Sequence, residues 1–139
     1  MKAIVCIDDG GGMTFNRRRQ SRDGVLLDDV AVMIENSHAR LLATSFSEKL
    51  LTSHGLWPLV IDDEMLKNAN DGDFCFVENL ALLPYIEKID TLIIYRWNRK
   101  YPSDFNFDII PEKNGFSLAE TTEFVGSSHE KITKEIYIK

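Results

Sequence analysis

Hydrophobic residues occur along the chain in short runs and in longer amphipathic segments. Residues 2–7 (KAIVCI) form a continuous apolar run that ends at DDGGGM, which predicts a buried strand followed by a glycine-rich loop. Residues 25–39 place Leu26 and Val30 at helical spacing, with acids on the other side, which predicts an amphipathic helix. Residues 15–24, between these two segments, show no periodicity, so we expect a loop there.

The rest of the pattern continues this alternation of strands and helices. It predicts strands over residues 40–45, 57–64, 73–78, 90–97, 116–124 and 131–139, and helices over 47–55, 63–72 and 79–89. Ser45 and Glu48 have the spacing of a capping box at the start of the second helix. This order of elements predicts one α/β domain over residues 1–139, with a mainly parallel, twisted sheet and an antiparallel C-terminal hairpin.

Composition and charge narrow the class of protein. The chain has 139 residues, with 16 Lys and Arg against 22 Asp and Glu, and its net charge of −6 disfavours general nucleic-acid binding. No apolar run approaches the roughly 18 residues of a membrane span. The first residues, MKAIVCIDD, carry acids where a signal peptide needs an apolar stretch and a cleavage site. We expect a cytoplasmic protein with no membrane partner.

The cysteines and histidines match no metal-binding or thiol-catalytic motif. Cys6 and Cys75 lie in apolar, strand-like runs, and we expect them to be buried and reduced. His38, His54 and His129 are isolated from one another, so we predict no metal site. His129 belongs to the stretch GSSHEK, which we interpret as a hairpin bend, because a Ser/His hydrolase needs its residues to meet in space.

Four arginines are concentrated in the stretch FNRRRQSRD. They are Arg17, Arg18, Arg19 and Arg22. They cannot all be buried, because each guanidinium carries five donors that need partners. One interpretation is a solvated loop in which one or two of them pair with nearby acids. The other is that they line a cleft together with Asn16 and clamp a phosphate or carboxylate, which arginine binds bidentately.

A second group of cationic and aromatic residues occurs in YRWNRKYPSD, at the end of a predicted strand. Strand alternation places Arg96 and Trp97 on opposite faces. Trp97 and Arg99 suit base stacking with phosphate contact, and Trp97 equally suits a cap on the core. Arg96 ends an apolar strand, where a charge needs a partner, so we interpret it as a ligand-site residue.

The order of the predicted elements resembles dihydrofolate reductase, and three stretches carry the resemblance. The opening strand that runs into GGGM resembles that family's first strand and its mobile glycine-containing loop. FCFVENLALLPYIEKIDTLIIYRW resembles the family's strand, Gly-Gly turn, helix and strand, and FSLAETTEFVGSSHEKITKEIYIK resembles its terminal hairpin. The resemblance covers nearly the whole chain and implies a three-layer, dihydrofolate-reductase-like fold.

The resemblance also implies roles for individual residues. The family places an acid at the start of its first helix, where it supports protonation of the pterin, and Asp23 falls at about that position. The strand position that approaches this acid in the family corresponds to Arg96. The resemblance therefore implies that Asp23 and Arg96 are the catalytic pair and face each other across the substrate cleft.

The cofactor side departs from the family's pattern. In the family, a Gly-Gly turn lets the backbone approach the phosphates of NADPH, whereas this chain carries Glu78 and Asn79 at the turn. A carboxylate near the phosphate position disfavours NADPH, and the cofactor stays unknown. Ser45 and Ser47, at a predicted helix N-terminus, are still able to hold an anion.

The sequence leaves three functions open. The first is a divergent dihydrofolate-reductase-like protein, not a classical NADPH-dependent reductase, that binds an anionic small molecule or a nucleotide in an arginine-lined cleft. The second is an RNA- or nucleotide-processing hydrolase of ribonuclease type without zinc, against which the net charge weighs. The third is a non-catalytic module whose arginines dock an acidic partner or a second copy of the chain. A concave arginine surface favours the first function, and a flat rim favours the third.

Overall fold

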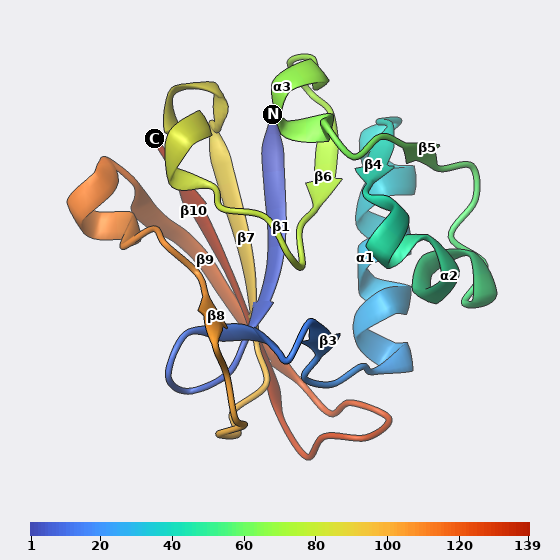
Figure 1. The fold of residues 1–139 in the computed structure, drawn as a ribbon, viewed down its shortest axis with the longest axis vertical. Helices are drawn as coiled ribbons and strands as arrows, with labels where there is room; N and C mark the ends of the chain where they lie inside the picture. Colours follow the sequence, from blue (N-terminus) through green and yellow to red (C-terminus); the bar gives the residue numbers. More distant parts are fainter.

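A seven-stranded sheet forms the centre of the computed structural model, which describes residues 1–139 (Figure 1). In spatial order its strands are β5 (Val60–Ile61), β4 (Leu41–Ala43), β6 (Phe74–Phe76), β1 (Lys2–Ile7), β7 (Thr91–Arg96), β10 (Ile132–Ile138) and β9 (Ser117–Phe124). β5, β4, β6, β1 and β7 pair in parallel. β10 runs antiparallel to both β7 and β9. The predicted mainly parallel sheet with an antiparallel C-terminal hairpin is therefore confirmed.

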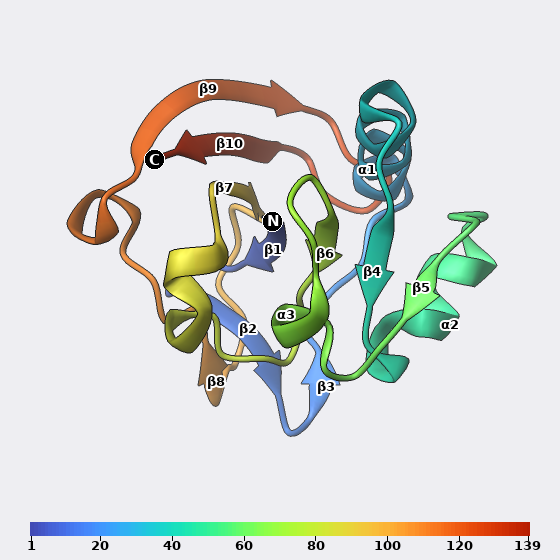
Figure 2. The ribbon, with the colours of Figure 1, turned by 90° about the horizontal axis from the view of Figure 1, so that it is seen from above.

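Short helices connect the strands and cover the sheet. They are α1 (Gly24–Ser37), α2 (Ser45–Ser53), α3 (Met65–Asn68) and the 3-10 segments η1 (Leu83–Lys88) and η2 (Pro111–Asn114). On one face of β7, Ile93 and Tyr95 belong to one buried cluster with residues of α1 and α2. Figure 2 shows α1 beside β4, and β9 and β10 next to each other at the other end of the sheet. On the other face of β7, Leu92 and Ile94 pack with α3 and with the segments that follow η1. The strands β4, β6 and β7 are continuous apolar runs because both of their faces are buried.

None of these helices combines the length and the apolar character that a bilayer crossing requires.

The predicted loop over residues 15–24 contains a β-hairpin, so that prediction is wrong for its first half. β2 (Gly12–Phe15) and β3 (Arg18–Arg19) pair antiparallel through a two-residue turn. The turn residues Asn16 and Arg17 have φ of 54° and 60°, as in a type I′ turn, whose twist matches that of the flanking strands. β8 (Phe105–Asn106) pairs with β2 and completes a second, three-stranded sheet.

Two local predictions about helices are also wrong. The helix expected over residues 79–89 forms only η1. Pro84 lies in the interior of the expected helix, where its missing amide hydrogen and its ring disrupt the helical turn, and none of the η1 residues is buried. The capping box at Ser45 is absent. The N-cap of α2 is Thr44, and the Ser45 amide donates to Asp63 instead.

The second sheet lies at the carboxyl ends of the parallel strands. In Figure 1 it crosses the lower end of the central sheet, and the chain passes from β3 directly into the start of α1. Since β2 follows β1 after only a short loop, the arginines of the hairpin stand beside the ends of β1 and β6. In open α/β sheets this edge is where ligands commonly bind.

Candidate anion-binding site

The four arginines of the hairpin region divide into one paired and three unpaired side chains. Arg19 forms an ion pair with Glu78. Arg17, Arg18 and Arg22 are exposed, and none of them has a carboxylate oxygen within 4.0 Å. The solvated-loop interpretation expected one or two of these arginines to pair with nearby acids. One of them, Arg19, is paired, and its partner is Glu78 rather than an acid close in sequence.

The acids closest in sequence are engaged elsewhere, and Asp8 shows how. This carboxylate is buried, and its Oδ1 accepts from the amides of Gly10 and Gly12 at 2.9 Å and 2.7 Å. Its Oδ2 accepts from the Tyr101 amide at 3.0 Å and from the Gln20 side chain at 3.2 Å. Asp8 thus fixes the base of the hairpin and is not available to an arginine.

The Arg19–Glu78 pair is bidentate and half-buried. Arg19 Nε donates to Glu78 Oε2 and its Nη2 donates to Oε1, both at 2.7 Å. The Ser47 hydroxyl also donates to Oε1 at 2.7 Å, and the guanidinium lies 5.2 Å from the centre of the Phe46 ring. Hydrogen bonding to Glu78 raises the pKa of Arg19 above its ordinary value, so this side chain stays charged. The acid at the end of β6 is therefore neutralised from within the chain.

The N-terminus of α2, where Ser45 and Ser47 were expected to hold an anion, already has two carboxylates of the chain itself. The Ser45 hydroxyl and amide both donate to Asp63, at 2.8 Å and 2.7 Å. Ser47 is fully buried and donates to Glu78. These contacts occupy the Ser45 amide and both serine hydroxyls, so an external anion bound by these groups would have to displace Asp63 or Glu78.

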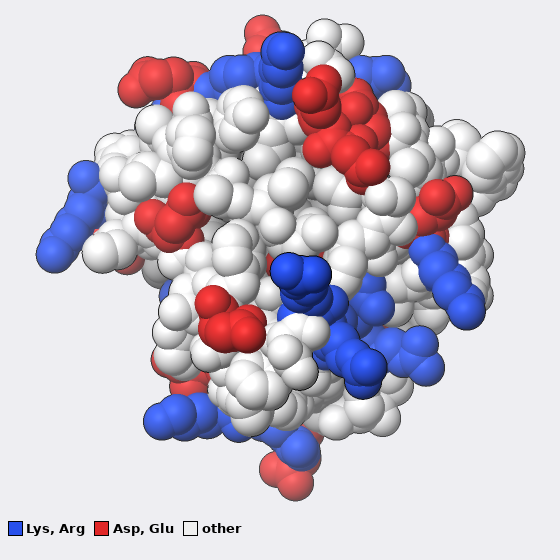
Figure 3. All heavy atoms as spheres, in the orientation of Figure 1, with Lys and Arg blue, Asp and Glu red and all other residues white.

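The unpaired arginines surround a concave surface. Arg17, Arg18, Arg19, Ser21, Arg22 and Phe46 line a hollow of about 730 Å³. Arg17 and Phe46 also line an adjoining hollow of about 430 Å³, together with Asn16. In Figure 3, blue side chains gather over the place that β3 occupies in Figure 1. The arginine hollow, as we call the first of these, is thus a local cationic surface on an acidic protein.

The structure does not bring Asp23 and Arg96 together. Arg96 Nε donates to Glu135 Oε1 at 2.6 Å, and Arg96 follows Leu92 and Ile94 on the face of β7 that points away from α1. Asp23 is the N-cap of α1, on the opposite face. Strand alternation therefore separates the two side chains that the resemblance placed across one cleft.

Asp23 instead forms a buried polar cluster with the C-terminal hairpin. Its carboxylate accepts from the amides of Val25 and Leu26 at 2.9 Å and 3.3 Å, and from those of Ser127 and Ser128 at 3.0 Å and 2.8 Å. A fifth contact joins Oδ2 to His129 Nδ1 at 3.0 Å. Burial alone would raise the pKa of Asp23, but these hydrogen bonds outweigh it and lower the pKa well below its usual range.

The structure favours the core-capping interpretation of Trp97. Its ring is only 4% exposed and stacks on His129, with centres 4.5 Å apart and planes 23° from parallel. A base could not stack on the same ring without displacing that histidine. Arg99 is exposed and forms no ion pair, and it is not among the residues that line the arginine hollow.

Both cysteines are free thiols, and Cys75 is buried whereas Cys6 is half-buried. Burial raises the pKa of the Cys6 thiol, and Glu78 adds to that shift. Burial likewise raises the pKa of Cys75 to about 12. Neither thiol is poised to act as a nucleophile, because both stay protonated near neutral pH. No group of three or more His, Cys, Asp or Glu side chains is arranged to hold a metal ion.

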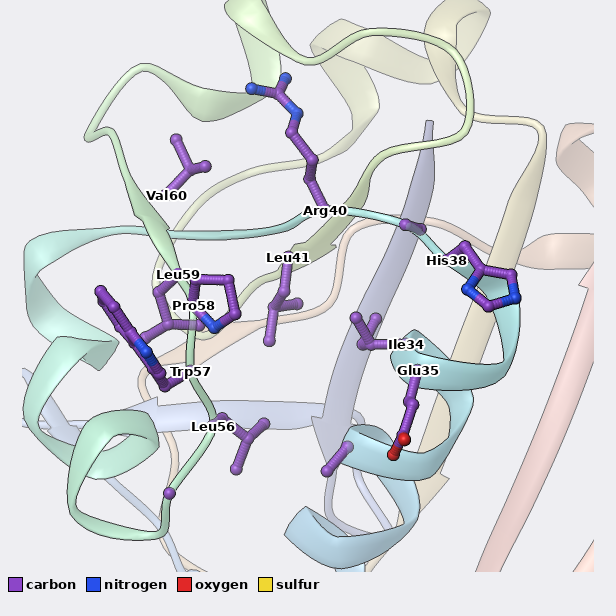
Figure 4. Close-up of a pocket in the computed structure, with 13 residues that line it drawn as sticks. Ile34, Glu35, His38, Arg40, Leu41, Leu56, Trp57, Pro58, Leu59 and Val60 are labelled. Atoms are coloured by element: carbon purple, nitrogen blue, oxygen red, sulfur yellow. The ribbon is translucent and has the colours of Figure 1, made fainter.

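A separate apolar groove lies between the C-terminal half of α1 and the segment that joins α2 to β5 (Figure 4). Its volume is about 540 Å³, and Ile34, Leu56 and Leu59 contribute to its walls. Trp57 is 81% exposed at its edge. None of the residues predicted for the ligand site lines this groove.

Comparison with known proteins bears on the fold. No protein-family model and no curated protein sequence matches the chain. Among solved structures, the dihydrofolate reductase of Enterococcus faecalis in complex with NADP(H) and RAB-propyl matches with a TM-score of 0.65 and 14% identity. The match covers 99% of this chain and 94% of that one. The chain therefore has the dihydrofolate-reductase-like fold.

Two residues beside His129 were not predicted. No sequence pattern relates Ser21 or Tyr101 to His129, yet both hydroxyls lie within 3.1 Å of its Nε2 atom. The bend itself was interpreted correctly as part of a hairpin, between β9 and β10. The signal that pointed toward the cluster was the alignment of Asp23 with the family's acid, although its partner proved to be His129 rather than Arg96.

Proposed function

We propose that the chain binds an anionic small molecule or a nucleotide, and that Arg17, Arg18 and Arg22 hold its phosphate or carboxylate group. The observation that carries this proposal is that three unpaired guanidiniums share one hollow in a chain of net charge −6. Like charges at close range repel each other, so a cluster of this kind is favourable mainly when an anion joins it. Arginine binds phosphates and carboxylates with two parallel hydrogen bonds.

The backbone of the turn supports the same proposal. Arg17 has φ of 60°, a left-handed conformation that favours glycine and costs a side-chain-bearing residue about 1 kcal/mol. Residues in such conformations tend to gather at functional sites. The chain thus places a guanidinium, rather than the glycine usual at this turn position, in a conformation that costs stability.

The place of the hollow and its lining favour a ligand over a docked protein. The hollow is shallow and open to solvent, and it lies at the carboxyl ends of the parallel strands. Phe46 supplies an apolar wall beside the guanidiniums, which suits a ring attached to a phosphate.

NADPH is not the cofactor that we assign to this site. The related fold of the Enterococcus faecalis enzyme was solved with NADP(H). In this chain the Glu78 carboxylate stands in the turn after β6 and is held there by Arg19 and Ser47. A phosphate at that turn would meet the Glu78 side chain instead of a glycine backbone, and it would have to displace the carboxylate from Arg19 and Ser47.

Thermal unfolding in the presence of a ligand panel tests the proposal. The panel contains inorganic phosphate, nucleoside mono- and triphosphates, short RNA, NADPH and dihydrofolate. A ligand at a hundred times its dissociation constant adds about 2.7 kcal/mol to the free energy of unfolding. We expect a phosphate or nucleotide to raise the melting temperature, and we expect Arg22→Gln to abolish the rise.

Lys113→Gln is the matched control, because it removes one exposed, unpaired cation from η2. Stabilisation by NADPH or dihydrofolate with no response to phosphates would contradict the proposal. So would an equal loss of the effect in the control variant.

A further inference from the structure

A row of three hydrogen-bonded side chains lies beside the arginine hollow: Ser21, His129 and Asp23. Their order is that of a nucleophile, a base and an orienting acid in a catalytic triad. Ser21 Oγ lies 3.0 Å from His129 Nε2, and His129 Nδ1 lies 3.0 Å from Asp23 Oδ2. Ser21 and His129 are 108 positions apart in sequence, so the fold alone brings them together. Both distances fall within the range for a working nucleophile–base–acid relay.

The acid and the base are held rigidly. The Asp23 side chain is fully buried and is fixed by four backbone amides, so it stays in place as a negative charge. His129 is 3% exposed and is stacked on Trp97. The carboxylate faces Nδ1, and the hydroxyls of Ser21 and Tyr101 converge on Nε2. This arrangement favours the tautomer with its proton on Nδ1, which leaves Nε2 free to accept a proton.

Ser21 is the member of the row that a substrate can reach. His129 and Asp23 are buried, whereas Ser21 is half-buried and lines the arginine hollow. A reaction at this place must therefore pass through Ser21 Oγ rather than through the imidazole itself. The neighbouring Arg22 also lines the hollow and offers positive charge for an oxyanion.

We propose that Ser21 is a catalytic nucleophile, activated by His129 and oriented through Asp23, that hydrolyses a carboxylic ester whose acyl part carries an anionic group. The anionic character of the substrate rests on the proposed function above. The reaction at Ser21 does not depend on that proposed function.

The steps balance without a further reactant. Ser21 Oγ attacks the ester carbonyl carbon while its proton passes to His129 Nε2. The carbon–oxygen bond to the leaving alcohol breaks, and that alcohol takes the proton from Nε2. Water then attacks the acyl-serine, gives one proton to Nε2 and releases the acid, and Ser21 recovers its hydroxyl proton.

Covalent labelling tests the nucleophile independently of anion binding. An uncharged alkyl fluorophosphonate forms a bond from serine Oγ to phosphorus and expels fluoride, and it needs no arginine. We expect mass spectrometry of the labelled, folded protein to place the adduct on Ser21. Ser21→Ala abolishes the adduct, and Ser117→Ala, a change of an exposed serine in β9, leaves it unchanged. No adduct on Ser21, while a known serine hydrolase in the same tube is labelled, overturns the proposal.

The role of the base is tested with His129→Gln, whose fold is checked by circular dichroism. We expect labelling to slow by at least about 100-fold. If this variant does not fold, Asp23→Asn gives the same test, because it keeps a side chain of the same shape at the N-cap. Labelling at the wild-type rate in either folded variant overturns the relay.

The substrate class is tested with two esters. We expect the 4-nitrophenyl monoester of succinic acid to be hydrolysed faster than uncharged 4-nitrophenyl butyrate, and we expect Ser21→Ala to abolish this hydrolysis. Equal rates on both esters overturn that class and leave the nucleophile standing.

Discussion

The Arg19–Glu78 ion pair allows a quantitative prediction about the stability of the site. Arg19→Ala leaves the Glu78 carboxylate, which is only 11% exposed, with the Ser47 hydroxyl as its remaining partner. Breaking a buried pair costs about 3–5 kcal/mol, and an exposed pair contributes at most about 1 kcal/mol. Since Arg19 is 24% exposed, we expect a loss between these limits, about 2 kcal/mol. For a chain of this length that loss lowers the melting temperature by about 7 °C.

A double-mutant cycle measures the pairwise part of this effect. Glu78→Gln keeps an acceptor for Ser47 and leaves a half-exposed cation that water can solvate, so we expect a loss of about 1 kcal/mol. The double variant should be about as stable as Arg19→Ala alone, which gives a coupling energy of about 1 kcal/mol by urea denaturation. Additive losses, with a coupling energy below about 0.3 kcal/mol, would show that the two side chains do not interact as described.

Three further changes test other parts of the structure. Asp23→Asn is expected to cost about 1.5–3 kcal/mol at pH 7. Because the folded-state pKa of Asp23 is lowered, its contribution is present above its unfolded value of about 3.9 and is lost as the pH falls further. Urea denaturation from pH 7 to pH 2 should therefore show a smaller acid loss in the variant, and an equal loss would refute this. Gly126→Ala places a Cβ atom 2.8 Å from Asp23 Cγ and 2.9 Å from Ile132 Cδ1, so a loss of about 1–3 kcal/mol is expected in thermal unfolding, and a neutral result would contradict this packing. Arg17→Gly relieves the positive φ and should raise stability by about 0.5–1 kcal/mol while weakening anion binding; a loss of stability would show that the turn is not strained.

Much of the fold could be predicted because its signals are local. β1 and β7 are continuous apolar runs, and β10 alternates between apolar and polar residues. The hairpin of β2 and β3 was missed because its strands are very short and its turn holds an arginine where glycine is usual. The helix over residues 79–89 was overestimated because its apolar content was given more weight than Pro84 in its interior; Leu82 and Ile89 are buried, but the η1 residues between them are not.

The site was less predictable, because its contacts join distant parts of the chain. Glu78 was recognised as an unusual residue at its turn, but its pairing with Arg19 spans 59 positions that no periodicity relates. The approach of His129 to Asp23 spans 106 positions and depends on how the C-terminal hairpin folds back over α1. Local patterns identified the unusual residues, and only the tertiary structure shows which of them are paired and which are left free.

The central claim is that the three unpaired arginines form an anion site, and isothermal titration with inorganic triphosphate tests it most directly. The wild-type chain is compared with a variant that carries Arg17→Gln, Arg18→Gln and Arg22→Gln together, at low ionic strength, where charge interactions are least screened. Each charge-assisted hydrogen bond contributes about 1.5–3 kcal/mol, so the variant should bind more than about 100-fold more weakly. Equal affinity in the two proteins, or no heat of binding to the wild type, would contradict the account.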